Sequence, residues 1–261
     1  MNPAMTLLRE RLELLEEQIR HACRCANRPR HEVELMAVSK TYPAATIEKA
    51  AELGLRLFGE NRVQEFASKA PDLEQWRVNG VIAASDEPML VHLIGHLQSN
   101  KTAWAADLFD AVDSLDSVRL AERLNEAAGR LHKRLPVLIE VKLSLEKTKE
   151  GVDPESAEAA ALLERLPDLK HLHMRGLMTI APWGVAEAET RACFRKLREI
   201  RDRWAAAHRH LKFDTLSMGM SGDFAIAIEE GATRIRIGTA LFGARPPMAA
   251  QREAYPEDFE E

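Results

Sequence analysis

Cysteine is scarce in this sequence. The chain of 261 residues contains three, Cys23, Cys25 and Cys193, an odd number whose spacing matches no disulfide framework. The pair at 23 and 25 has no second Cys/His pair at the spacing of a zinc site. His92 and His96 are four residues apart, but the sequence between them is predicted to be strand and loop, so they would not share one face of a zinc-binding helix. We therefore expect reduced thiols and no metal site.

Long apolar runs are also absent. Charged residues interrupt the N-terminal stretch every few positions, which excludes the apolar core of a secretory signal peptide. No stretch approaches the roughly 18 uncharged apolar residues of a membrane-spanning helix. The net charge of −5 lacks the basic surplus typical of proteins that bind nucleic acid. These absences predict a cytoplasmic protein that has neither nucleic acid nor a membrane as its partner.

Alternating strand-like and helical patterns dominate the rest of the chain. Apolar residues make up 46 % of it, enough for a sizeable core. An amphipathic helix is predicted over residues 4–25, and Pro29 should stop it. The predicted strands are 34–40, 57–61, 91–95, 108–114, 136–143, 174–181, 215–220 and 234–238. The predicted helices between them are 44–53, 63–69, 100–106, 117–131, 154–166, 187–208 and 224–230.

Strands that alternate with helices indicate βαβ units and a parallel sheet. Eight such units favour a single closed (β/α)8 barrel of the TIM type with an extra N-terminal helix, over an open doubly wound sheet. We expect residues 1–30 to form a helix packed on the barrel, residues 31–245 to form the barrel, and residues 246–261 to form a flexible acidic tail. Residues 78–88 are expected to be an exposed loop or insertion.

Functional groups of such barrels lie where the strands end. Lys40 stands at the end of the first predicted strand, after the apolar Met36, Ala37 and Val38. Apolar surroundings disfavour the ammonium form of a lysine, and a neutral amine can form a Schiff base with an aldehyde. The alternative is a lysine that caps the strand and points to water.

The loops after strands seven and eight often bind phosphate in barrels of this type. Here they contain Ser217, Ser221, Gly238 and Thr239. Glycine allows backbone N–H groups to approach an anion, and a helix that starts after Asp223, a potential N-cap, adds favourable partial charge. The alternative is an ordinary turn with an ordinary cap.

Two arginines are expected inside the barrel. Arg234 and Arg236 alternate with Ile235 and Ile237, so strand geometry places the arginines on one face and the isoleucines under the helices. A buried arginine needs an acceptor, either a structural carboxylate or a ligand atom at the barrel mouth. These groups together match pyridoxal 5′-phosphate (PLP). The Lys40 amine suits its aldehyde, the anion site suits its phosphate, and the Arg236 guanidinium suits its pyridine nitrogen.

Several longer motifs carry a resemblance. They are AVSKT at 37–41, FGEN at 58–61, VQE at 63–65, HLIGHLQSNK at 92–101, RGLM at 175–178, LSMGMS at 216–221 and RIGTALFG at 236–243. In this order they resemble the pyridoxal phosphate homeostasis proteins, which are related to the barrel domain of alanine racemase and other fold-type III PLP enzymes. The resemblance covers nearly the whole chain beyond the leading helix.

The resemblance implies a (β/α)8 barrel with PLP as its cofactor. It implies Lys40 for the Schiff base, Asn61 and Met178 beside the ring, Ser217, Gly238 and Thr239 around the phosphate, and Arg236 at the pyridine nitrogen. Three features depart from the family pattern: residues 78–88 look like extra sequence, Lys142 replaces a more usual Asn, and residues 145–151 match only loosely.

Storage or delivery of PLP is favoured over catalysis. Arg236 would leave the pyridine nitrogen unprotonated, which makes the ring a weaker electron sink. The second domain of the related racemases has no counterpart after Gly243, and neither Tyr42 nor Tyr255 is placed as an opposite-face base. We expect a monomeric homeostasis protein that holds PLP on Lys40, with client apo-enzymes or free amino acids as its partners. A one-domain amino-acid racemase or lyase, and a barrel for another phosphorylated ligand, stay open as alternatives.

Overall fold

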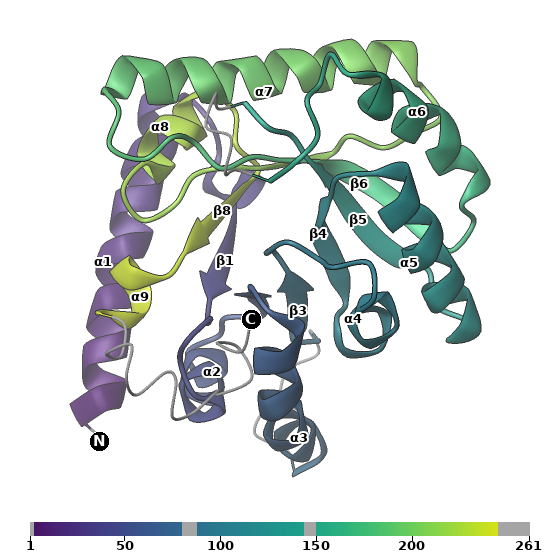
Figure 1. Ribbon diagram of the computed structural model, residues 1–261. Coiled ribbons are helices and arrows are strands. Elements are labelled where there is room, and N and C mark those ends of the chain that lie inside the picture. Colours follow the sequence, from purple (N-terminus) through teal and green to yellow (C-terminus); the bar gives the residue numbers. More distant parts are fainter. Residues whose placement is uncertain (1–2, 80–87, 144–149, 245–261) are drawn as a thin grey trace.

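A closed parallel barrel forms the centre of the molecule (Figure 1). The computed structural model describes residues 3–79, 88–143 and 150–244. The strands follow one another around the barrel in chain order. They are β1 (Glu34–Val38), β2 (Leu57–Glu60), β3 (Leu90–Leu93), β4 (Ala111–Leu115), β5 (Leu135–Glu140), β6 (Leu172–Met178), β7 (Thr215–Ser217) and β8 (Arg234–Ile237). Pairing of β1 with β8 closes the ring, so the predicted (β/α)8 barrel is confirmed and the open sheet was wrong.

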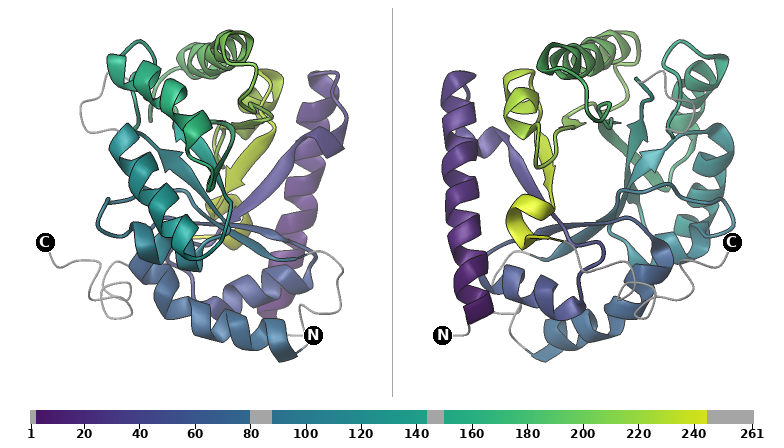
Figure 2. Two further views of the ribbon diagram at one scale, coloured as in Figure 1. Left: turned by 90° about the vertical axis from the view of Figure 1, so that its right-hand side faces the viewer. Right: turned by 60° about the vertical axis from the view of Figure 1, so that its left-hand side comes forward.

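Helices surround this barrel on its outside (Figure 2). They are α1 (Pro3–Cys25), α2 (Ala44–Glu52), α3 (Val63–Asn79), α4 (Thr102–Leu108), α5 (Val118–Arg130), α6 (Ala157–Arg165), α7 (Glu187–Ala207), α8 (Phe224–Glu229) and α9 (Thr239–Phe242), with 3-10 turns η1 (Arg30–Glu32) and η2 (Leu166–Asp168). No helix in the described part of the chain is long and apolar enough to cross a membrane.

Helix α3 differs from the prediction. The sequence pattern ended this helix at residue 69, and a loop was expected from residue 78 onward. A proline removes a backbone donor and normally disfavours a helix interior. The helix continues to Asn79 with Pro71 inside it. Its apolar face extends past the proline, since Phe66 and Leu73 are both buried in the core. Residues 80–87 of the expected loop lie outside the described residues.

Serine side chains fix where two helices begin. Ser117 Oγ accepts a hydrogen bond from the backbone N–H of Leu120 at 3.4 Å and caps α5. Ser156 Oγ accepts from Ala159 N at 3.2 Å and caps α6. Such caps satisfy N–H groups that have no partner within the helix. The helix predicted to start at residue 154 therefore starts after Ser156.

The N-terminal helix α1 lies along the outside of the barrel beside α8 and α9, in every view of Figures 1 and 2. Leu15 on this helix is 2 % exposed. Arg11 Nη1 donates to the carbonyl oxygen of Phe242 at 2.9 Å. In the turn that follows the helix, Arg28 Nη1 donates to the carbonyl oxygen of Ile228, also at 2.9 Å. The first helix is thus joined to the last two.

Arginine and isoleucine alternate on β8 as predicted. Ile235 is fully buried. Arg234 pairs with Glu34 on the neighbouring β1 at 2.8 Å and reaches across the barrel interior to Asp113 on β4 at 3.2 Å. Asp113 Oδ1 also lies 3.1 Å from His92 Nδ1. Burial alone would raise the pKa of Asp113, but His92 and Arg234 outweigh burial and hold that pKa below its usual value. For Arg234, the acceptor is therefore a structural carboxylate.

A glycine permits a bulge in β6. Val137 pairs with Met174 while Leu138 pairs with Gly176, so the strand gains one residue between them. Gly176 has a φ of +154°, and a Cβ atom there would lie 1.9 Å from the carbonyl oxygen of Thr215 on the neighbouring β7. No side chain fits at this position without backbone movement.

Replacing Gly176 with alanine should lower the free energy of unfolding by about 1–3 kcal/mol, because the strand must shift away from Thr215. Urea unfolding followed by circular dichroism measures the change. Gly222→Ala serves as the control, since a Cβ there meets no atom within 4 Å. Equal stability of the two variants would contradict the close approach.

Candidate cofactor site

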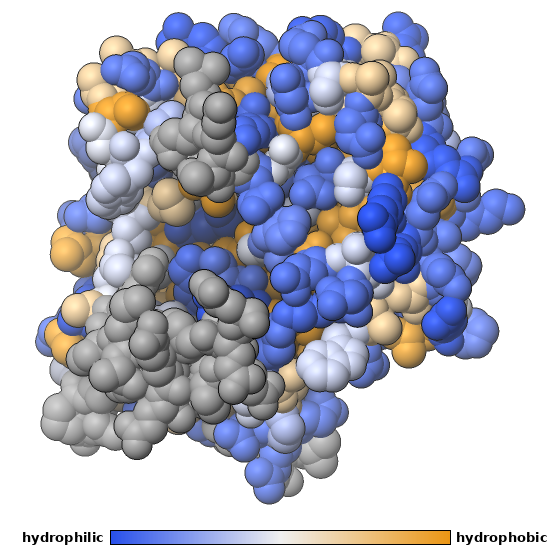
Figure 3. Space-filling view, in the orientation of Figure 1, coloured by the Kyte–Doolittle hydropathy of each residue, from blue (hydrophilic) through white to orange (hydrophobic). Residues whose placement is uncertain are grey.

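A cavity of about 840 Å³ opens at the carboxyl ends of the strands. This volume lies within the roughly 300–1,000 Å³ of small-molecule sites. Hydrophilic side chains dominate the molecular face shown in Figure 3, with hydrophobic ones visible mainly between them. The cavity is lined by five of the seven predicted site residues: Lys40, Asn61, Arg236, Gly238 and Thr239. The barrel thus brings together residues at or just after the ends of β1, β2 and β8, far apart in the sequence.

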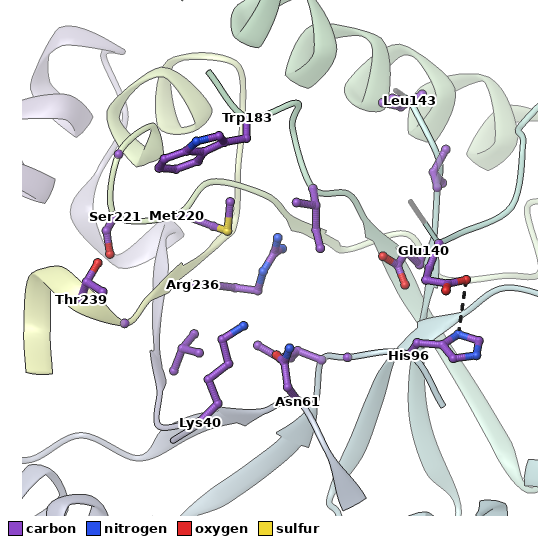
Figure 4. A pocket seen from close by; sticks show the side chains of 18 of the residues that line it. Lys40, Asn61, His96, Glu140, Leu143, Trp183, Met220, Ser221, Arg236 and Thr239 are labelled. Atoms are coloured by element: carbon purple, nitrogen blue, oxygen red, sulfur yellow. Dashed lines mark ion pairs between the residues drawn. The ribbon is translucent and has the colours of Figure 1, made fainter. Parts of the chain in front are cut away.

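Lys40 follows the end of β1 and is half-buried. Its side chain extends into the cavity beside Asn61, and Arg236 lies across from it (Figure 4). The next residue, Thr41, has a φ of +69°, a left-handed conformation that is unusual for threonine. The chain therefore turns sharply at the residue after the lysine, and this turn sets where the amine points.

A buried charged group lies behind this turn. Lys69 on α3 is 2 % exposed, and its Nζ donates to Glu60 Oε1 at 2.9 Å and to Glu65 Oε1 at 2.6 Å. We call Glu60, Glu65 and Lys69 the Lys69 cluster. Burial raises the pKa of Glu60 to about 7, with Lys69 opposing the rise and Glu65 adding to it. Glu60 Oε2 has no hydrogen-bond partner within the described structure.

The Lys69 cluster holds the backbone on both sides of Lys40. Glu60 Oε1 accepts from Ser39 Oγ at 2.7 Å, and Lys69 Nζ donates to the carbonyl oxygen of Ser39 at 3.2 Å. On the other side, Glu65 Oε1 accepts from the backbone N–H of Thr41 at 2.5 Å. The strained turn after β1 is therefore stabilised by buried ionic hydrogen bonds.

The opposite end of the cavity offers uncharged donors. Ser221, Gly222, Gly238 and Thr239 line it, and they come from the loops after β7 and β8. A Cβ atom at Gly222 would meet no other atom within 4 Å, so its backbone faces open space. Ser221 Oγ accepts from Ala240 N at 3.2 Å and joins the two loops. Backbone and hydroxyl donors of this kind suit an anion.

Two predicted residues do not line this cavity. Ser217 and Met178 are fully buried at the ends of their strands, and Ser217 lies behind Arg236. The loop after β7 places Met220 at the cavity surface instead. Asp223 makes no side-chain cap on α8, and its Oδ1 accepts from Met220 N at 2.5 Å, which tightens that loop.

Arg236 is 4 % exposed, and neutral oxygens accept its hydrogen bonds. Its Nη1 donates to the carbonyl oxygen of Ser217 at 2.7 Å and to Ser217 Oγ at 2.9 Å, and its Nη2 donates to the carbonyl oxygen of Thr179 at 2.9 Å. Burial lowers the pKa of this guanidinium, while Asp113 and Glu140 oppose the effect. Carbonyl and hydroxyl oxygens thus hold a cation at the cavity wall, and no carboxylate of the described residues contacts it directly.

The side of the cavity away from Ser221 carries acidic groups. Glu140, the last residue of β5, lines the cavity and is 6 % exposed. Burial raises the pKa of its carboxyl to about 7, Arg236 opposes the rise, and Asp116 and Glu150 add to it. We call Glu140, Asp116 and Glu150 the acidic group. The sequence reading missed Glu140 because it extended this strand to residue 143; the signal was a carboxylate inside the apolar run VLIEV.

His96 stands next to the acidic group. Its Nδ1 lies 3.6 Å from Asp116 Oδ2 and 3.7 Å from Glu150 Oε2, the second contact being dashed in Figure 4. Ligand atoms of these three residues lie within 4.8 Å of one another, the one such group in the described part of the chain. Because His96 and Glu150 are exposed and already paired, we assign no metal, and the expectation of a metal-free protein stays a prediction.

The pH dependence of the unfolding free energy should reveal the raised pKa of the Glu140 carboxyl group. Its pKa is raised above the usual 4.5, so the folded state binds the proton more tightly. This contribution is fully present below about pH 4.5 and is lost as pH rises through about 7. Relative to wild type, Glu140→Gln should gain roughly 3 kcal/mol of unfolding free energy between pH 4.5 and 8.5. Urea unfolding at both pH values tests this. Glu189→Gln, at an exposed position, should show no such gain. If the unfolding free energies of the two variants change equally with pH, the pKa of Glu140 is not raised by burial.

Comparison with known proteins agrees with this geometry. A family profile described as "Alanine racemase, N-terminal domain" matches residues 11–246. A protein of Haemophilus influenzae named pyridoxal phosphate homeostasis protein is 39 % identical over 246 residues, which cover 94 % of this chain and 99 % of that protein. A protein of the same name in Pseudomonas aeruginosa is 41 % identical over 241 residues, covering 92 % of this chain and 97 % of its own.

Solved structures share the fold. The PipY protein of Synechococcus elongatus PCC7942, determined with PLP bound, is 41 % identical with a TM-score of 0.77, and the match covers 90 % of this chain and 100 % of PipY. Alanine racemase of Clostridium difficile is 15 % identical with a TM-score of 0.69, covering 92 % of this chain and 57 % of the racemase. The racemase likeness shows the fold alone. The chain belongs to the pyridoxal phosphate homeostasis proteins, a group within the alanine racemase N-terminal domain family.

Proposed function

We propose that this protein binds PLP in the barrel cavity and holds it as a Schiff base on Lys40, for storage or delivery inside the cell. The observation that carries the proposal is the convergence of the Lys40 amine, the Arg236 guanidinium and an uncharged donor end in one cavity. These three groups match the aldehyde, the pyridine nitrogen and the phosphate of PLP. The structure of the related PipY with PLP bound supports PLP as the ligand.

The residues present fit the cofactor. Ser221, Gly238 and Thr239 are placed to receive the phosphate, with the open backbone of Gly222 beside them. Asn61 lies next to Lys40 and can contact the ring (Figure 4). When bound, PLP would supply an electrophilic aldehyde carbon. The chain's own residues bind its phosphate, orient its ring and offer the amine.

Arg236 favours binding over catalysis. Its guanidinium donates hydrogen bonds and does not accept them, so a pyridine nitrogen facing it would stay unprotonated. An unprotonated ring withdraws electrons less strongly, which disfavours reactions through a carbanion. At the cavity rim, Trp183 is 88 % exposed, and water access weakens electrostatic preorganisation. We therefore infer a carrier instead of a catalyst. We further propose, from the sequence, that it is cytoplasmic and monomeric and that its partners are client apo-enzymes or free amino acids.

The absorption spectrum of the purified protein tests this function. Saturation with PLP should produce a visible band that disappears on borohydride reduction. Peptide mass measurement should then locate a PLP-sized adduct on Lys40. A protein that stays colourless and gains no mass at Lys40 would overturn the proposal. Turnover of single-enantiomer amino acids well above that of free PLP, followed by optical rotation, would replace the carrier with a one-domain racemase or lyase.

A further inference from the structure

The two ends of the cavity differ in charge: one offers uncharged hydrogen-bond donors and the other carries acidic side chains. Ser221 and Thr239 form the uncharged donor end, Lys40 and Arg236 lie in the middle, and Glu140 lies on the far side (Figure 4). A cofactor whose phosphate occupies the donor end and whose aldehyde reaches Lys40 would leave the far side for a second molecule. The charge on that side indicates what this molecule is.

Glu140 lacks a partner that would explain its burial. The residue is 94 % buried and its carboxyl group lines the cavity, yet among the described residues no side chain or backbone group forms a hydrogen bond or an ion pair with that carboxyl group. Arg236 attracts it electrostatically, but that guanidinium directs its hydrogen bonds to Ser217 and Thr179. A buried carboxylate without a partner is costly in free energy. A cationic ligand in the cavity would satisfy it.

We propose that Glu140, with Asp116 and Glu150 behind it, forms a subsite for the primary ammonium group that takes PLP from Lys40. This inference rests on the proposed function and specifies the acceptor. The preferred acceptor is an amine with no carboxylate beside it, as in the side chain of a lysine on another polypeptide.

The exchange balances without an oxidant or reductant. The incoming ammonium gives one proton to the Glu140 carboxylate, and its neutral nitrogen attacks the carbon that joins PLP to Lys40. A new C–N bond forms, and the two remaining N–H protons of the incoming nitrogen pass to Lys40 Nζ. The C–N bond to Lys40 Nζ then breaks, and Glu140 returns its proton, so that Lys40 leaves as an ammonium group. A carboxyl group with a pKa of about 7 is suited to accept and return a proton at neutral pH.

Charge on this side should select among amines. Glu140 and Glu150 line this side of the cavity together with His96 and the half-buried Lys142, and Asp116 lies behind them beside His96. The cations Lys40 and Arg236 lie further away, in the middle of the cavity. Among the described residues on this side, three acidic side chains outnumber the one lysine, so the field favours an ammonium group over a second carboxylate. An α-amino acid carries its carboxylate next to its amine and is disfavoured here, unlike a lysine side chain.

The test compares n-pentylamine with L-norleucine, which differ only by the α-carboxylate. The PLP-loaded protein is first shown by borohydride trapping to carry PLP on Lys40. Each amine is then mixed with it at pH 7, and loss of the protein-bound band is timed against the reaction of the same amine with free PLP. Wild type should favour n-pentylamine. Glu140→Gln should slow transfer to n-pentylamine at least about tenfold, whereas Glu189→Gln should match wild type.

Unchanged transfer in Glu140→Gln, or equal normalised rates for the two amines in wild type, would overturn the subsite. If Glu140→Gln does not fold, Asp116→Asn replaces it, since it weakens the field without touching the buried carboxyl. Asp116→Asn must then reduce the preference for n-pentylamine, and an unchanged preference would equally overturn the subsite. Absence of the Lys40 adduct in wild type is a different result, because it would remove the proposed function itself.

Discussion

Replacing Lys40 with alanine should abolish the visible band of the PLP-treated protein and the borohydride-trapped adduct, while the protein stays folded. The side chain is half-buried and reaches into the cavity instead of the core, so its removal leaves the barrel packing intact. The Lys69 cluster holds Ser39 and Thr41 through their backbone and hydroxyl groups. The turn should therefore persist without the amine.

Absorption at saturating PLP and circular dichroism of the same sample measure both parts of this prediction. Lys101→Ala is the matched control, because Lys101 precedes α4 outside the cavity lining. It should keep the full band. A band that survives in Lys40→Ala would place the imine on another lysine and would contradict the assignment of the site.

Replacing Lys69 with methionine should lower the free energy of unfolding by about 3–5 kcal/mol at pH 8. The change removes the cation that pairs with Glu60 and Glu65, and it leaves two buried carboxylates side by side. Because methionine retains most of the volume of lysine, the loss of unfolding free energy should come mainly from the missing charge and less from changed packing.

The loss should become smaller as pH falls, because protonated carboxyls need no counter-charge. Urea unfolding at pH 8 and pH 5 gives both values. Lys196→Met, at an exposed position on α7, should change stability by less than about 0.5 kcal/mol. A loss below about 1 kcal/mol in Lys69→Met at pH 8 would show that the cluster does not hold two charged glutamates.

Sequence periodicity was sufficient for the fold. Strand-like runs alternating with helical ones predicted the barrel, because each βα unit has its own apolar pattern. The ends of the strands were less predictable. The run at 34–40 continues past Val38, where β1 ends, and the run at 215–220 continues past Ser217, where β7 ends. Hydrophobicity does not mark where the hydrogen-bond ladder stops, so Lys40 lies in a turn and not on a strand.

The site could be predicted only in part. Lys40 and Arg236 follow from strand-end position and alternation, and both line the cavity. Ser217 was selected from the loop after strand seven and from the resemblance. It instead lies buried at the end of β7, hydrogen-bonded to Arg236, and the loop residue Ser221 lines the cavity. The Lys69 cluster depends on a helix residue turning back toward β1 and β2. No local pattern encodes such a contact.

The contact between α1 and α9 constrains how the protein is made. Arg11 bonds to Phe242 across 231 positions, and Tyr42 Oη donates to the carbonyl oxygen of Gly243 at 2.7 Å. Barrel closure likewise pairs the first strand with the eighth. During synthesis the N-terminal elements emerge from the ribosome long before their partners exist. The cavity, with Lys40 on one wall and Thr239 on another, therefore takes shape only after nearly the whole chain has been translated, and no nascent fragment can hold the vitamer between those two walls.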